Sequence, residues 1–358
     1  MKELQKGLRG VEKASRAADA IFDLFAPFVE ENNPCFSSQR IRHLSARLND
    51  DERAVFGFDL TDLDWRTYWA EIHMGGLQKW VFGELDAKMR STKKVAKARD
   101  LIEVFRTTTR ANAERRALSL FGETDIALSY TYDEVWEGAC RVASWLKAKG
   151  IRKGDAVLLI SRNEPAWPMV YFGILLADGV VVPLDWEMPS SEVRRIARKA
   201  DARLAIIHED ADLDLGISTV FTGDVFEAEP LEQLESRDRS NDVASLLFTS
   251  GTTGDPKGVM LTHANFTALL ASLHGTFDVT HRDRFLSVLP LFHTFEFSCG
   301  FLMPLSKGAH ILYLDNLEGQ HLRSALRQFR PSGLIGVPAL WDVLHRRIES
   351  RVRDRGQA

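Results

Sequence analysis

The sequence predicts an α/β protein in which a small, mainly helical N-terminal module precedes a larger domain with a mainly parallel sheet and flanking helices. Three observations support this fold class. Apolar residues near the N-terminus recur at alternating spacings of four and three, which is one face of a helix. Between residues 156 and 207, apolar runs alternate with helical segments, a pattern typical of parallel strands joined by right-handed crossovers. Two further short apolar runs then flank a loop rich in glycine and threonine.

The composition favours packed cores and argues against several classes of binding protein. Of the 358 residues, 45% are hydrophobic, which is enough for two domains of ordinary size. The net charge of -4 argues against a general nucleic-acid-binding surface. The cysteines Cys35, Cys140 and Cys299 are widely spaced and form no C-x-x-C pair. We therefore expect reduced thiols in a cytoplasmic protein, no nucleic acid partner and no metal site.

An amphipathic helix is predicted from Lys2 to Glu30, with an interruption near Pro27. Its apolar face could dock on its own domain, or could contact a partner helix or a membrane surface. The charges of this segment distinguish it from a secretory signal. The most apolar later stretch, residues 169–184, contains Asp178 and Pro183 and so falls short of a membrane span.

Aromatic side chains between residues 53 and 82 predict the core of a small helical module. This region contains three short motifs, Phe56-x-Phe-Asp, Asp64-Trp-x-x-Tyr and Gly76-x-x-Lys-Trp-Val-Phe. They resemble the C-terminal domain of fatty acyl-CoA reductases, and the resemblance covers residues 1–89. It implies the tail of such a unit, because neither a glycine-rich dinucleotide loop nor a Tyr-x-x-x-Lys motif precedes it in this chain.

A polar, basic stretch at residues 90–99 is predicted to be a linker. A solvated connector is the ordinary interpretation of such a charge run, and contact with an anionic membrane surface is the alternative. The larger domain then occupies residues 100–358.

The elements of the larger domain follow from apolar patterns and helix-start signals. Asp133 is predicted to cap a helix that ends at Lys149. The continuous apolar run 156–160 is typical of a strand covered on both faces. The series then continues with a helix at 164–176, a strand at 180–184, a helix at 190–199 and a strand at 204–207.

The segment Thr249-Ser-Gly-Thr-Thr-Gly-Asp-Pro-Lys-Gly258 has the composition of a phosphate-binding loop. Glycines let backbone N–H groups converge on an anion, hydroxyls add donors, and Lys257 supplies a mobile positive charge. The apolar runs 244–248 and 259–261 predict a strand on each side of the loop. A plain hairpin turn is the alternative, although a turn needs far fewer special residues. The spacing excludes a Walker A loop, because Asp255 and Pro256 separate Gly254 from Lys257.

This segment and the following Val259-Met-Leu-Thr-His-Ala-Asn265 resemble the phosphate signature of the adenylate-forming superfamily. Leu289-Pro-Leu-Phe-His-Thr-Phe-Glu296 resembles the next motif of that family, in a His-x-x-Glu form similar to the long-chain fatty acyl branch. Gly336-Val337-Pro338 resembles one wall of the pocket for the carboxylate substrate. The resemblance implies activation of a fatty acid by ATP to acyl-AMP, and transfer to the thiol of CoA or of carrier-protein phosphopantetheine.

The resemblance also implies roles for particular residues. His293 would be the catalytic residue, bordering the carboxylate and the α-phosphate. The acid pocket would include Phe292, Gly336, Val337 and Pro338, although Phe292 is equally suited to the core. Mg²⁺ would bridge the phosphates of ATP. The phosphates themselves would be held by Thr249, Ser250, Gly251, Thr252, Thr253, Gly254, Lys257 and Gly258.

The resemblance covers about two thirds of the family's large domain and none of its small one. We therefore expect an incomplete piece of a multidomain protein of lipid metabolism, inactive alone, whose partners are a fatty acid and the missing C-terminal part. Peripheral membrane contact remains open. A non-catalytic nucleotide-binding or protein-interaction module is the alternative function.

Overall fold

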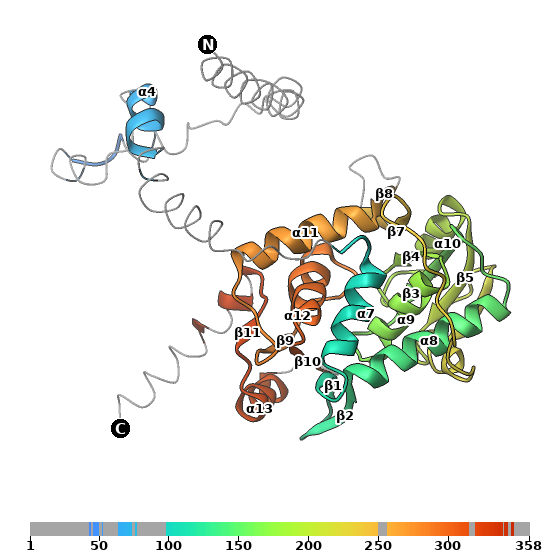
Figure 1. Cartoon of the computed structure of the whole chain (residues 1–358). Helices are drawn as coiled ribbons and strands as arrows, with labels where there is room; N and C mark the ends of the chain where they lie inside the picture. The colour runs from blue at the N-terminus through green and yellow to red at the C-terminus, as the bar shows by residue number, and fades with distance from the viewer. Residues whose placement is uncertain are drawn as a thin grey trace, which may run out of the picture. The chain divides into compact units, whose positions relative to one another are not determined.

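The computed structural model of the chain describes residues 43, 46–49, 52, 64–73, 76, 98–249, 256–314, 319–338, 340–342 and 345–346. The chain divides into two compact units, Met1–Gly83 and Glu84–Ala358 (Figure 1). The predicted helix from Lys2 to Glu30 lies outside the described residues. The predicted boundaries at residues 89 and 100 stay predictions.

In the first unit, a short α-helix, α4 (Trp65–Thr67), leads directly into a π-helix, η2 (Tyr68–His73). Asp64 begins this helical segment. Its carboxylate accepts a hydrogen bond from the Thr67 hydroxyl at 2.6 Å and another from the Arg66 backbone N–H at 3.0 Å. The described segment is helical, and the helical module predicted for residues 1–89 stays a prediction.

Two sheets organise the second unit. The six-stranded sheet has the order β6-β5-β3-β4-β7-β8, and the five-stranded sheet has the order β11-β9-β10-β1-β2. Neighbouring strands run parallel except in the outer pairs β7–β8 and β1–β2, which confirms the mainly parallel sheet.

The strands of the six-stranded sheet are β3 (Ala156–Ile160), β4 (Val180–Pro183), β5 (Ala202–Ile207), β6 (Ser218–Phe221), β7 (Val243–Thr249) and β8 (Lys257–Thr262). Those of the five-stranded sheet are β1 (Arg116–Phe121), β2 (Ile126–Thr131), β9 (Arg284–Ser287), β10 (His310–Leu314) and β11 (Gly333–Leu334). Among the described residues, the helices of the unit include α7 (Leu101–Ala111), α8 (Tyr132–Ala148), α9 (Ala166–Leu176), α10 (Ser190–Lys199), α11 (His263–Thr276), α12 (Met303–Ser306) and α13 (Gly319–Phe329), with the 3₁₀-helix η4 (Gly223–Phe226) and the π-helix η5 (Glu296–Leu302).

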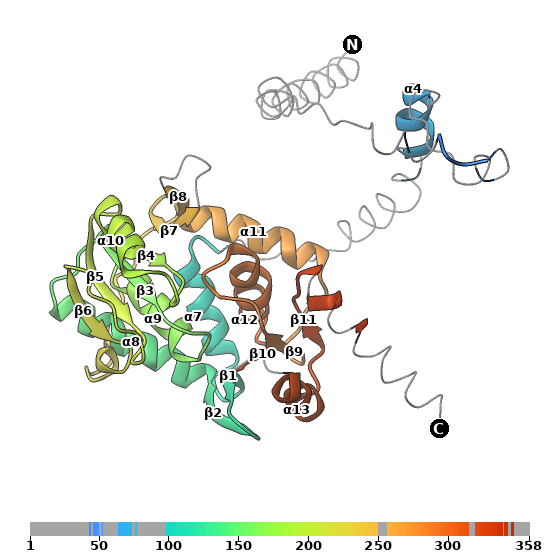
Figure 2. The same ribbon diagram turned by 180° about the vertical axis from the view of Figure 1, so that it is seen from behind.

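Successive side chains of a strand point to opposite faces of the sheet, so their contacts show which helices cover each face. In β3, Val157 and Leu159 join a large core that includes α7, α8, α9, α12 and η5, whereas Leu158 and Ile160 pack with α10. In β10, Ile311 and Tyr313 belong to the same large core. The opposite face of β10 packs with α13. The two sheets therefore enclose a shared helical layer, with α10 and α13 on their outer faces, and Figure 2 shows the same arrangement from behind.

The predicted elements from residue 132 to residue 207 are confirmed, with one correction. The helix predicted to begin at Asp133 is capped instead by Thr131, whose hydroxyl accepts a hydrogen bond from the Glu134 N–H at 3.2 Å. The Glu134 carboxylate in turn accepts one from the Thr131 N–H at 2.7 Å. This reciprocal pair is a capping box, which satisfies two N–H groups at once and so outcompetes a single carboxylate two residues later.

Helix α9 is the centre of the shared layer. Every residue from Trp167 to Leu176 is buried, as expected for a helix enclosed on all sides. Helix α8 approaches α9 closely at Gly173, where an added Cβ would lie 2.4 Å from a Val142 methyl carbon and 3.1 Å from the Ala139 carbonyl oxygen. None of the described helices has the length and apolarity needed to cross a membrane, and residues 169–184 form α9 and β4.

We expect Gly173→Ala to lower the free energy of unfolding by about 1–3 kcal/mol, because the methyl group overpacks the contact between α8 and α9. Chemical denaturation would measure this change. Gly223→Ala is the matched control, since the same methyl group there meets only the flexible Glu209 carboxylate at 3.1 Å. Equal stability of the two variants would contradict this account of the packing.

Candidate active site

The predicted phosphate loop joins two strands, as the sequence indicated. Strands β7 and β8 pair in antiparallel fashion, with Phe248 opposite Gly258 and Thr249 opposite Lys257 at the end of the ladder. The intervening residues 250–255 lie outside the described part of the chain. The proposed roles of Ser250, Gly251, Thr252, Thr253 and Gly254, and of the Thr249 side chain, therefore stay predictions.

The described end of the loop leaves one cation facing solvent. Lys257 is exposed and makes no ion pair with another described residue, whereas Pro256 before it is buried. Gly258 lies close to the facing strand, since an added Cβ would be 3.0 Å from Leu246 and 3.1 Å from Phe248. The ammonium group of Lys257 is therefore available to an anion at the end of the hairpin.

Strand β7 is fixed inside its sheet by a buried hydroxyl pair. The Tyr171 hydroxyl of α9 lies 2.7 Å from the Ser245 hydroxyl, and Ser245 is also opposite Val181 of β4. Burial raises the pKa of Tyr171 above its ordinary value, so this phenol stays neutral. The contact ties the strand that leads into the loop to the central helix.

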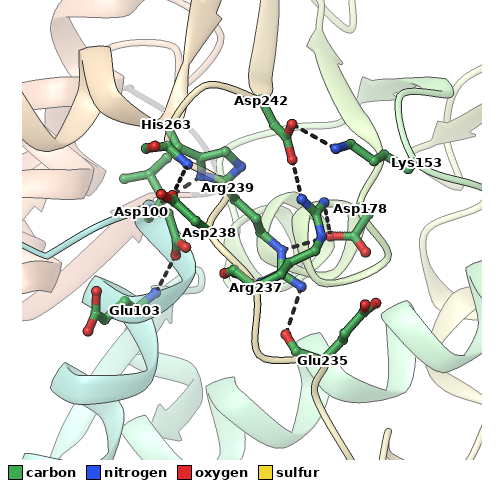
Figure 3. Close-up of polar contacts among 12 residues, drawn as sticks. Asp100, Glu103, Lys153, Asp178, Glu235, Arg237, Asp238, Arg239, Asp242 and His263 are labelled. Carbon is green, nitrogen blue, oxygen red and sulfur yellow. Dashed lines mark hydrogen bonds and ion pairs between the residues drawn. The ribbon is translucent and has the colours of Figure 1, made fainter.

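A cluster of charged residues holds the other end of β7, and we call it the ion-pair cluster (Figure 3). Asp178 accepts hydrogen bonds at 2.7 Å from both Arg237 and Arg239. Arg237 also contacts Asp242 at 2.5 Å, and Lys153 lies 2.9 Å from the same carboxylate. Burial alone would raise the pKa of Asp178, but the hydrogen bonds from the two arginines outweigh it and lower that pKa. The segments that enter β3, β4 and β7 are thereby joined.

The two sheets meet through the side-chain amide of Asn163, which follows β3. Its Nδ2 donates to the Leu289 carbonyl at 2.6 Å, and its Oδ1 accepts from the Leu291 N–H at 2.9 Å. Leu289 and Leu291 belong to the segment after β9, so the carboxyl ends of β3 and β9 are adjacent. Ligands of open α/β sheets bind outside the carboxyl ends of the strands.

His293 and Phe292 lie on this same segment. The Pro290 carbonyl accepts a hydrogen bond from the His293 N–H at 3.1 Å, which closes a turn. The His293 side chain is exposed, and its ring centroid is 4.2 Å from that of the half-buried Phe292. The imidazole is thus presented at the surface of the carboxyl edge.

Gly336, Val337 and Pro338 follow β11, whose parallel pairing with β9 brings them to the same edge. Val337 is 40% exposed, and the Trp341 indole N–H donates to the Gly336 carbonyl at 3.2 Å. An added Cβ at Gly336 would lie 2.9 Å from that indole. The sequence-predicted pocket residues therefore gather at one edge of the five-stranded sheet.

Glu296 is a functional candidate to which the sequence analysis gave no role. Its side chain is 0% exposed, and its Oε1 accepts a hydrogen bond from the Ser287 hydroxyl at 2.6 Å. Among the described residues its Oε2 has no partner, and neither has the buried hydroxyl of Tyr313. Burial raises the pKa of Glu296 to about 7, against a smaller opposing effect of the Ser287 hydrogen bond.

Asn163 was also missed, although it stands three residues after an apolar strand, where polar residues reach the carboxyl edge. Within the described residues, no group of His, Cys, Asp and Glu side chains could hold a metal ion. Cys140 is buried, and burial raises the pKa of its thiol to about 11, which keeps it protonated and unreactive.

The chain belongs to the AMP-binding enzyme family, whose model matches residues 105–357. This match confirms the predicted membership in the adenylate-forming superfamily. The predicted reductase-like module precedes the matched range and stays a prediction.

Several curated relatives are acid–CoA ligases. The chain is 29% identical over 222 residues to a feruloyl-CoA synthase of Amycolatopsis sp, covering 60% of this chain and 45% of the relative. It is 31% identical to 4-coumarate–CoA ligase 3 of Arabidopsis thaliana, covering 59% and 42%. The long-chain-fatty-acid–CoA ligase ACSBG2 of Homo sapiens is 26% identical, with 61% and 38% covered. The chain thus spans less than half the length of these relatives.

Solved structures agree on the fold. The nonribosomal peptide synthetase FmoA3 in its AMPPNP-bound form superposes with a TM-score of 0.64 at 25% identity, covering 75% of this chain and 29% of that one. The O-succinylbenzoate coenzyme A synthetase of Bacillus subtilis in complex with AMP gives a TM-score of 0.60 at 21% identity, covering 67% and 63%. These likenesses confirm the predicted α/β fold class.

We expect Glu296 to make the protein less stable as the pH rises. Its pKa of about 7 in the folded state exceeds the ordinary 4.5, so the stability present below pH 4.5 is lost as the pH rises through 7. The loss reaches about 3 kcal/mol. The glutamine side chain of Glu296→Gln stays neutral. The free energy of unfolding of this variant, relative to that of the parent, should therefore increase between pH 4.5 and pH 8.

Chemical denaturation across that pH range measures the difference. Glu137→Gln is the control, because Glu137 is half-exposed and pairs with Arg141 on the surface of α8. Parallel pH profiles for the parent and Glu296→Gln would show that burial does not perturb this carboxyl group.

Proposed function

We propose that this chain binds ATP with Mg²⁺ through residues 249–258 and holds a carboxylic acid beside the α-phosphate for activation to an acyl-adenylate. The observation that carries the proposal is the contact of Asn163 with the segment after β9. This contact brings the carboxyl edges of the two sheets next to each other. One edge includes the end of β7, from which the phosphate motif continues, and the other presents the histidine motif.

The described residues suit the charge that ATP brings. Lys257 is an exposed cation at the end of the hairpin, and it would offset negative charge on the phosphate oxygens. Mg²⁺ prefers phosphate oxygens and water over cages built from protein groups. When bound, Mg²⁺ would neutralise charge on the phosphates.

The acid would lie between the histidine turn and the segment after β11. The exposed His293 imidazole would border the carboxylate, and Phe292, Val337 and Pro338 would supply an apolar wall. Holding the carboxylate in line with the α-phosphate provides most of the rate, because adenylation depends on position and on charge neutralisation.

We propose a fatty acid as the substrate, with CoA or carrier-protein phosphopantetheine as the acceptor thiol. The His293-x-x-Glu296 motif and the reductase-like N-terminal motifs favour this choice over an aromatic acid. Some relatives are named for aromatic acids and one for long-chain fatty acids. The relatives are more than twice as long as the matched region. We therefore assign only the binding steps to the residues of this chain.

Nucleotide binding is the first test. ATP with Mg²⁺ should raise the thermal midpoint of the chain in a saturable way, and Lys257→Ala should weaken the apparent affinity by about tenfold. Lys199→Ala removes an exposed lysine at the end of α10 and is the matched control. If ATP leaves the midpoint of the parent unchanged, the domain is a non-catalytic module and the proposal is wrong.

Acid preference is the second test. With ATP present, a long-chain fatty acid should stabilise the chain further, and a cinnamate-type acid should not. Val337→Asp would place a charge in the apolar wall and should abolish the effect of the fatty acid while ATP binding persists. A preference for the aromatic acid would overturn the proposed substrate class.

A further inference from the structure

A cavity lies at the amino edge of the five-stranded sheet. Strands β1, β10 and β9 begin there side by side, at Arg116, His310 and Arg284. The cavity has a volume of about 310 Å³. It is lined by Arg115, Arg116, His281, Arg282, Asp283, Arg284 and His310, and we call it the basic pocket.

The positive charge of the basic pocket is not neutralised by its one acidic residue. Both oxygens of Asp283 are already used: Oδ1 accepts from the Ser332 hydroxyl at 2.8 Å, and Oδ2 accepts from the Thr280 N–H at 2.7 Å and its hydroxyl at 3.0 Å. The four arginine side chains are exposed, and none forms an ion pair with another described residue. Arginines elsewhere in the unit, such as Arg141 and Arg237, do have carboxylate partners.

Two of the four guanidinium groups are held in place. Arg115 donates through Nη2 to the His281 carbonyl oxygen, and Arg284 lies 5.8 Å from the ring centroid of Phe329. Arg116 and Arg282 make no side-chain hydrogen bond to another described residue and are free to turn toward a ligand. Two of the four cations thus have such a contact with the surrounding protein, and among the described residues the other two have none.

The half-buried base of the pocket carries a neutral histidine. His310 Nε2 lies 2.8 Å from the Ser119 hydroxyl, and its ring packs edge-on against Phe329 with centroids 4.9 Å apart. Burial, with the nearby charges of Arg116 and Arg284, lowers the pKa of His310 to about 4. His310 adds no charge at neutral pH, so the positive electrostatic potential of the pocket comes from the arginines around it.

We propose that the basic pocket is a binding site for a phosphate monoester, separate from the proposed nucleotide site. Guanidinium groups form paired hydrogen bonds with phosphate oxygens, and four arginines line this small concave volume. The pocket lies at the amino edge of the sheet, whereas Phe292 and His293 follow β9 at its carboxyl edge. The phosphate could belong to a soluble metabolite or to a phospholipid headgroup.

The test compares variants of equal charge change. Inorganic phosphate and glycerol 3-phosphate are titrated into the full chain at constant ionic strength, and binding is followed by calorimetry. Arg116→Gln with Arg282→Gln should weaken binding by at least about tenfold, the loss expected when charge-assisted hydrogen bonds disappear. Arg152→Gln with Arg198→Gln removes two exposed arginines elsewhere and should bind as the parent does.

Three outcomes would overturn the proposal. They are an absence of saturable binding, an equal loss in both double variants, and a loss that requires Lys257→Ala instead. The last outcome would mean that phosphate occupies the nucleotide site. A failure of ATP binding leaves this test intact, because the arginine variants leave the hairpin unchanged.

A vesicle arm identifies the source of the phosphate. Phosphatidylcholine vesicles with and without phosphatidic acid are sedimented with the chain. Binding that needs phosphatidic acid and is lost in Arg116→Gln with Arg282→Gln assigns the pocket to a lipid headgroup. Binding of the soluble esters without vesicle binding assigns it to a metabolite, and both results support a phosphate site.

Discussion

The two hydrogen bonds of the Asn163 amide join the carboxyl ends of two separate sheets, and the geometry of the candidate site depends on that junction. A side-chain amide can serve as donor and acceptor at once, so one residue satisfies both Leu289 and Leu291. Each sheet alone would present only half of the predicted contacts, namely the phosphate hairpin or the histidine turn. Aspartate at this position would keep the acceptor and lose the donor, which leaves a carbonyl group without its partner.

The strand that leads into the hairpin is constrained near both of its ends. At the amino end the ion-pair cluster joins Asp242 to Arg237 and Lys153, and inside the sheet Ser245 meets the Tyr171 hydroxyl. Rigid supports favour the binding of a polyanion by the loop. The conformational entropy of the supporting strand is then lost during folding and no longer reduces the free energy of binding. Arg237 and Arg239 of the ion-pair cluster have carboxylate partners, whereas the exposed Lys257 at the end of the hairpin forms no ion pair with another described residue.

Sequence patterns predicted the layers better than the polar contacts. The run 156–160 is buried at every position, which is why its apolar pattern sufficed to predict a strand. The cap at Thr131 was missed because the prediction considered Asp133 as a single residue type and not the reciprocal pair that the signature Thr131-x-x-Glu134 provides. The burial of Glu296 depends on the register of η5, where an added Cβ at Gly300 would lie 2.3 Å from its carboxylate oxygen. The basic pocket joins Arg115 to His281 across 166 residues, and only the parallel order of β1, β10 and β9 makes them neighbours.

Buried titratable groups have opposite effects on how the stability of the fold changes with pH. Burial lowers the pKa of His263, His274 and His310 to about 4, so each contributes stability that is present above 6.5 and lost as the pH falls through 4. Glu296 has the opposite sign, because its raised pKa makes the folded state less stable as the pH rises through 7. Three histidines outweigh one glutamate between pH 4.5 and pH 6.5, where both effects operate. The stability supplied by these groups is therefore greatest near neutral pH, where the histidines are neutral in both states and the glutamate is only partly ionised.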